Sequence, residues 1–67
     1  MPEARLISEP TRIRVDPLGI VWACTVIDSH GCLHGLTIKN GSRMRAMLRL
    51  LGIPNAIADK QARKVED

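Results

Sequence analysis

Four side chains near the middle of the sequence could bind a metal ion or carry out nucleophilic chemistry. Two cysteines with two histidines form the ligand set of many zinc sites. Here the spacing is C-x5-H-x-C-x-H, which matches none of the usual ligand pairs, so we expect no bound metal and no cofactor. The four residues are Cys24, His30, Cys32 and His34.

A nucleophilic cysteine is a second chemistry that this cluster allows, because His34 lies diagonal to Cys24 on the strands predicted below. A catalytic thiol also needs an oxyanion site, a group that orients the histidine, and a cleft. The sequence gives no sign of these, and 67 residues rarely enclose a substrate pocket. We therefore predict no enzyme activity and no small-molecule substrate. Cys24 and Cys32 would lie about 13 Å apart at ~3.4 Å per residue, too far for a disulfide.

Positive charge is concentrated in one segment of the chain. Ten Lys and Arg face seven Asp and Glu, a formal net charge of +3, and residues 39–54 contain no acid. Arginine forks match phosphate oxygens, and a helix N-terminus adds backbone N–H donors. The segment therefore predicts contacts with nucleic acid or with an acidic, nucleic-acid-bound protein complex. The predicted binding residues are Arg12, Arg14, Lys39, Arg43, Arg45 and Arg49.

Two of these arginines, Arg45 and Arg49, lie one helical turn apart and have no acid near them in the sequence. We therefore expect neither to have a partner within the chain, and both to be free for an external ligand.

Three β-strands are needed to position these groups. Residues 11–16 alternate polar and apolar side chains, which predicts a half-buried strand. Residues 20–27 are apolar and largely β-branched on both faces, which predicts a central strand, and residues 32–39 predict a third. The segments 16–19 and 28–31 both place Asp first and Gly fourth, as tight turns favour. The result is an antiparallel meander.

The turns also predict the register, since a slip of one residue would exchange the faces of the sheet. Pairing across both turns places Trp22 between Ile13 and Ile38. The predicted core face holds Ile13, Val15, Ile20, Trp22, Cys24, Val26, Leu36 and Ile38. The predicted second face holds Arg12, Arg14, Val21, Ala23, Thr25, Ile27, Leu33, Thr37 and Lys39.

Two helices are predicted after the sheet. Apolar residues at i, i+3, i+4 and i+7 indicate an amphipathic helix over residues 43–51, with Ser42 as its N-cap and Gly52 at its end. Asn55 can cap a short helix over residues 56–64. The apolar stripe of the first helix consists of Met44, Met47, Leu48 and Leu51.

The fold class is therefore α+β, with the order βββαα. Residues 1–10 carry two prolines and mixed charge, which predicts an extended arm in which a short strand over residues 5–8 is an open alternative, and residues 11–67 form a single small domain. No apolar run approaches the roughly 20 residues that span a bilayer, and residues 1–9 lack the apolar core of a signal peptide. We expect a cytoplasmic protein with reduced thiols and no membrane contact.

Two functions remain open. Three-stranded sheets with a helix behind them can dock one face into a DNA groove, and this order of elements resembles, in arrangement alone, the arm-binding domains of phage integrases. The first function is thus a small nucleic-acid-binding protein. The second is a stoichiometric inhibitor or adaptor of the phage or mobile-element type, which binds a host protein complex. It would act either as a monomer or as a homodimer. Its interface would use the apolar residues of the second face, Val21, Ile27 and Leu33.

Overall fold

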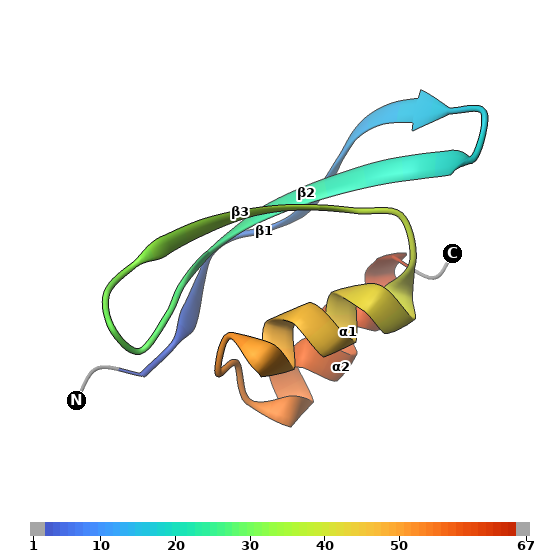
Figure 1. The fold of residues 1–67 in the computed structure, drawn as a ribbon. Helices are drawn as coiled ribbons and strands as arrows, with labels where there is room; N and C mark the ends of the chain where they lie inside the picture. The colour runs from blue at the N-terminus through green and yellow to red at the C-terminus, as the bar shows by residue number, and fades with distance from the viewer. Residues whose placement is uncertain (1–2, 66–67) are drawn as a thin grey trace.

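The fold has the predicted order of three antiparallel strands and two helices. A computed structural model describes residues 3–65. The strands form one sheet in the order β1-β2-β3, and both helices cover the same face of it (Figure 1). The elements are β1 (Arg5–Asp16), β2 (Gly19–Ile27), β3 (Leu33–Ile38), α1 (Gly41–Leu50) and α2 (Asn55–Val65).

The turn between β2 and β3 and the register beyond it confirm the prediction. The Asp28 N–H donates to the Cys32 carbonyl at 2.9 Å, and Gly31 has a φ of 87°, the left-handed region that glycine adopts without strain. The pairs between these strands then run without a shift, and Trp22 lies opposite Ile38.

Pairing between β1 and β2 differs from the prediction beyond the first turn. Val15 lies opposite Ile20 as expected, but Arg12 instead of Ile13 lies opposite Trp22, because the register shifts between Arg12 and Arg14. The irregularity inserts one extra residue, so Arg12 and Arg14 fall on opposite faces of the sheet. Placing both arginines on the second face was therefore wrong.

Two residues of the predicted core face, Ile13 and Val15, are exposed by 49% and 73%. The reason is visible in Figure 1, where the β1–β2 hairpin extends past the ends of the two helices. The helices end before the tip of this hairpin, so its apolar side chains lack a covering helix.

The segment expected to be an arm belongs largely to β1. This strand begins at Arg5, which lies opposite Ile27, and Ala4 is buried in the core. The chain before and after residue 10 is therefore one continuous strand, with further register shifts on either side of Ser8. Residues 1 and 2 of the expected arm lie outside the described residues.

Helix α1 begins two residues earlier than predicted. Its N-cap is Asn40 instead of Ser42, because the Asn40 side-chain oxygen accepts a hydrogen bond from the Arg43 N–H at 2.8 Å. Its end is as predicted: Gly52 has a φ of 96°, and the Ile53 N–H donates to the Leu48 carbonyl at 2.9 Å. This Schellman arrangement turns the chain sharply enough to bring α2 back along α1.

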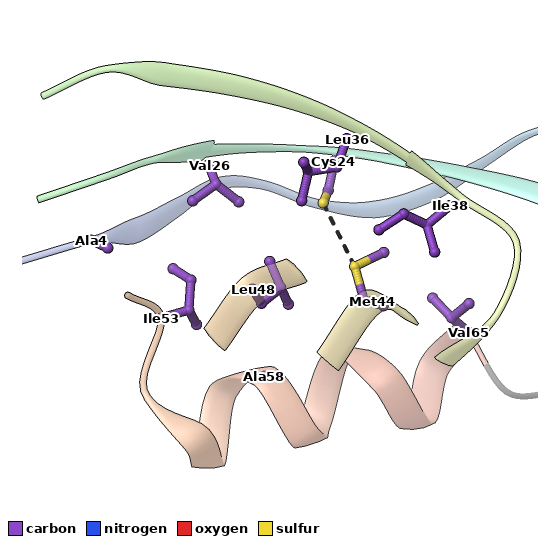
Figure 2. Close-up of a cluster of buried hydrophobic side chains, with 10 residues drawn as sticks. All are labelled: Ala4, Cys24, Val26, Leu36, Ile38, Met44, Leu48, Ile53, Ala58 and Val65. Carbon is purple, nitrogen blue, oxygen red and sulfur yellow. Dashed lines mark hydrogen bonds between the residues drawn. The ribbon is translucent and has the colours of Figure 1, made fainter. Parts of the chain in front are cut away.

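The core lies between the sheet and the two helices (Figure 2). Met44 and Leu48 of α1 are fully buried and stand between the sheet and α2. At one end, Lys64 of α2 donates to Glu9 of β1 at 2.6 Å, and this contact lowers the pKa of Glu9. The buried cluster consists of Ala4, Cys24, Val26, Leu36, Ile38, Met44, Leu48, Ile53, Ala58 and Val65.

Candidate nucleic-acid interface

The two cysteines and two histidines singled out from the sequence do not converge on one point. Cys24 is buried, its Sγ lies 3.9 Å from the Met44 Sδ, and burial raises the pKa of its thiol (Figure 2). Cys32 is exposed at the far end of the sheet. Among residues 3–65, no three of the His, Cys, Asp and Glu side chains are close enough together to hold a metal ion. Cys24 thus acts as a core residue.

Asp28 organises the turn that contains the other members of the cluster. One carboxylate oxygen accepts the N–H groups of His30 and Cys32 at 2.8 and 2.9 Å, and the other lies 2.7 Å from the His34 Nε2. The hydrogen bond to His34, followed by the one from Cys32, lowers the pKa of Asp28 to about 2. These residues therefore form a turn held together by the Asp28 carboxylate, and His34 has a structural role in it.

Asp28→Asn should destabilise the fold most at neutral pH. A carboxyl group whose pKa is lowered by folding stabilises the native state above its unfolded value, near pH 3.9, and this stabilisation disappears as the pH falls through the folded value near 2. Thermal unfolding followed by circular dichroism should therefore show that the wild type melts at a higher temperature than Asp28→Asn at neutral pH. This difference in melting temperature should shrink toward zero as the pH is lowered to about 2. Glu3→Gln, which removes an exposed carboxylate, is the matched control. An advantage that stays constant with pH would contradict this account.

The six predicted binding cations do not form one patch. Arg12 lies on the helix side of the sheet, where its guanidinium carbon stands 5.6 Å from the centre of the Trp22 ring, a cation–π contact. Arg14 and Lys39 lie on the opposite, open face. The remaining three residues, Arg43, Arg45 and Arg49, are on α1.

On the open face, Arg14, Lys39 and Asp16 form an ion-pair triad. The Asp16 oxygens lie 3.2 Å from the Arg14 Nε and 2.9 Å from the Lys39 Nζ. The hydrogen bond from Lys39 contributes most to lowering the pKa of Asp16, and Arg14 adds to it. The sequence reasoning did not identify Asp16, although Arg14 and Asp16 at i and i+2 share one face of a strand. The triad holds two cations in fixed positions.

This triad also explains why Val21 is not an interface residue. Val21 is fully buried, in contrast to the prediction, although it points to the open face. Arg14 lies opposite it on β1, and Lys39 follows Ile38 and so occupies the corresponding position beside it on the other flank. With both cations held by Asp16, we attribute the burial of Val21 to their aliphatic stems. The other two predicted interface residues remain accessible: Leu33 is 67% exposed and Ile27 is half-buried.

Arg45 has a partner within the chain, which corrects the expectation from sequence. Its Nε lies 2.8 Å from the Asp59 Oδ1 of α2, an ion pair in which the buried Nε–H forms no hydrogen bond. Arg43 and Arg49 are exposed and form no ion pair with residues 3–65. Arg45 therefore helps to join the two helices and is a poor candidate for ligand binding.

Both helices lie on the other side of the sheet (Figure 1), and apart from the buried Val21 the side chains of the open face are exposed or half-buried. Its central side chains are small. Gly35 on β3 would place a Cβ atom in open space, with nothing within 4 Å. Cations stand toward both ends, Arg5 beside Ile27 at one and the triad at the other. The face comprises Arg5, Ser8, Thr11, Arg14, Asp16, Val21, Ala23, Thr25, Ile27, Leu33, Gly35, Thr37 and Lys39.

A shallow groove of about 370 Å³ lies near the start of α1. Its only ionisable lining residue is Lys39, whose amine is paired with Asp16. The groove therefore offers no nucleophile with a neighbouring base. The lining residues are Gly19, Ile20, Trp22, Lys39, Asn40, Gly41 and Val65.

Within the described part of the chain, no helix is long and apolar enough to cross a membrane. Comparison with known proteins finds no matching family, no matching curated protein and no matching solved structure.

Proposed function

We propose that this chain is a small non-enzymatic protein that binds duplex DNA through the open face of its sheet. The observation that carries the proposal is the combination of an uncovered three-stranded face, small central side chains and cations toward its ends. Three strands at ~4.8 Å spacing place the outer strands about 10 Å apart. The major groove of B-form DNA is about 12 Å wide, whereas the major groove of A-form RNA is too narrow for such an element.

The cations on this face have distinct roles in the proposal. Arg14 and Lys39, positioned by Asp16, contact phosphates at one end of the groove, and Arg5 contacts the backbone at the other. The hydroxyl groups of Thr25 and Thr37 face the base edges between them, where threonine can donate or accept. Asp16 neutralises part of the positive charge, which limits non-specific binding.

Removing the two triad cations tests this proposal directly. The variant Arg14→Gln with Lys39→Gln should weaken binding to a mixed-sequence DNA duplex and lower the salt slope of log K by about two, since each lost phosphate contact removes roughly 0.9. The matched control is Arg43→Gln with Arg49→Gln, which removes the same charge from α1 and should leave the slope nearly unchanged. Fluorescence anisotropy at several salt concentrations measures both.

One further variant and the pattern of losses in the two double variants distinguish binding by the triad from attraction by net charge. Asp16→Asn keeps both cations but removes the adjacent negative charge, so it should tighten binding. An equal loss in both double variants would indicate attraction by net charge alone, and a loss confined to the α1 variant would move the interface to the helix. Failure of the wild-type protein to bind any duplex would overturn the proposal.

A protein partner is the second candidate function, favoured by one observation. Leu33 is 67% exposed and lies opposite Ile27, which gives one end of the open face an apolar character. A stoichiometric inhibitor or adaptor would use this end, and Leu33→Asp should then abolish partner capture while the triad variant does not. For either function, two free thiols are compatible with the cytoplasmic location expected from the sequence.

A further inference from the structure

The two outer strands of the sheet differ in how well their free edges could accept another strand. Three register shifts interrupt the pairing of β1, which also contains Pro10 and several charged side chains. Irregularity, proline and charge are the usual means by which proteins protect an exposed edge from pairing. The free edge of β1 is therefore poorly suited to pair with another strand.

The free edge of β3 has none of these protections. The strand Leu33–Ile38 pairs with β2 without a shift and contains no proline, Lys, Arg, Asp or Glu. It lies at the margin of the sheet, next to β2 alone. A regular and uncharged edge of this kind is a template for strand addition.

The backbone groups that this edge offers follow from the hydrogen bond at the turn. The Asp28 N–H donates to the Cys32 carbonyl. Hydrogen-bonded pairs alternate along an antiparallel ladder, so His34, Leu36 and Ile38 direct their backbone groups toward β2. The intervening residues, Leu33, Gly35 and Thr37, direct their N–H and C=O groups outward.

We propose that a second copy of this chain pairs with the free edge of β3, antiparallel and around a two-fold axis at Gly35. In this register Leu33 lies opposite the partner's Thr37 on the open face, and Gly35 lies opposite the partner's Gly35. All three outward residues of each copy then have backbone partners. The product is a six-stranded sheet with the helices of both copies on one side and both open faces on the other. Its outer strands lie about 24 Å apart at ~4.8 Å per strand, wider than one major groove, so this dimer and the DNA complex proposed above exclude each other.

Charge and composition indicate a second copy as the occupant. Identical strands that pair around a two-fold axis set like charges near each other, and β3 carries no Asp, Glu, Lys or Arg to repel its copy. Lys39, the first cation after the strand, is ion-paired with Asp16 at 2.9 Å. The exposed Leu33 side chain would pack against the methyl group of the partner's Thr37. A domain of 67 residues also gains from added burial.

Thr37→Pro tests the interface. Proline removes the outward N–H of Thr37 but no hydrogen bond to β2, so the monomer should still fold. Sedimentation velocity across a wide dilution series should show a reversible wild-type dimer with micromolar affinity, since the interface is small, and a monomer for the variant. Thr37→Ala, which keeps the N–H, should remain a dimer. A wild-type protein that stays monomeric throughout, or a dimeric proline variant, would overturn the proposal.

A crosslink tests the register without relying on the proline variant. Hydrogen-bonded antiparallel pairs have Cα atoms about 5.5 Å apart, within the range that a disulfide spans. Gly35→Cys in a Cys32→Ser background should therefore oxidise to a covalent dimer, and open space around the new Cβ keeps the fold intact. Ser42→Cys in the same background, exposed on α1, is the control and should not crosslink. Equal crosslinking of both would show random collision. Neither measurement involves DNA, so it stands apart from the proposed function.

Discussion

Leu48→Asp should prevent the chain from folding. Leu48 is fully buried in the last turn of α1, between the sheet and α2 (Figure 2). Truncating such a leucine to alanine costs about 2–5 kcal/mol, and a buried unpaired carboxylate costs more. The total stability of a small domain is about 5–15 kcal/mol, with short chains near the lower end. Circular dichroism should show no cooperative thermal transition for this variant.

The matched control for this substitution is two residues away on the same helix. Leu50 is 79% exposed, so Leu50→Asp introduces the same charge without burying it. Its unfolding free energy should stay within about 0.5 kcal/mol of the wild-type value. A cooperative transition in Leu48→Asp near the wild-type temperature would show that α1 packs against the sheet through another face.

Features that depend on neighbouring residues could be predicted from the sequence. Asp28 and Gly31 specify a turn whose hydrogen bonds lie within it, and that turn sets the register of all β2–β3 pairs. Gly52 ends α1 for a similar reason, since its left-handed conformation and the Ile53 to Leu48 hydrogen bond are local. These local signals were sufficient to predict the βββαα order.

The irregular pairing of β1 could not be predicted in the same way. Ile13 and Val15 alternate with polar residues as in any half-buried strand, and the alternation continues through the register shift. Whether such side chains are buried depends on where the helices end, which is a property of the assembled fold. The predicted pairing of Ile13 with Trp22 was wrong because β1 carries an extra residue between Arg12 and Arg14, which the alternation of side chains does not reveal.

The charged site depends on contacts between residues far apart in the sequence. Asp16 at the end of β1 and Lys39 after β3 lie on either side of β2, and their side chains meet across the open face. Arg45 meets Asp59 because the chain reverses at Gly52 and brings α2 back along α1. A count of charges along the chain therefore located the excess of cations but not their partners. The candidate site therefore lies on the open face of the sheet, whereas the sequence had indicated α1.

Gly35→Leu should abolish DNA binding while leaving the fold intact. The glycine lies in a regular strand, and a Cβ atom there would meet nothing within 4 Å, so nothing within the described chain requires its small size. Glycine weakens a strand by roughly 0.5–1 kcal/mol, and leucine at this position should therefore leave the stability unchanged or raise it. A leucine side chain projecting from the open face midway along the outer strand β3 would hold that side of the sheet away from the groove floor. Anisotropy titration and thermal unfolding measure the two effects separately.

The control for this variant adds the same bulk elsewhere on the surface. Ala46 is exposed on α1, and Ala46→Leu should retain wild-type affinity for the duplex. Gly35→Ala should lie between the two leucine variants, since one methyl group lifts the face less than a leucine does. Because Gly35→Leu changes no charge, a loss of affinity would reflect shape, with the salt slope of any residual binding set by fewer phosphate contacts. Wild-type affinity in Gly35→Leu would exclude the open face as the DNA-binding surface, whatever the triad variants show.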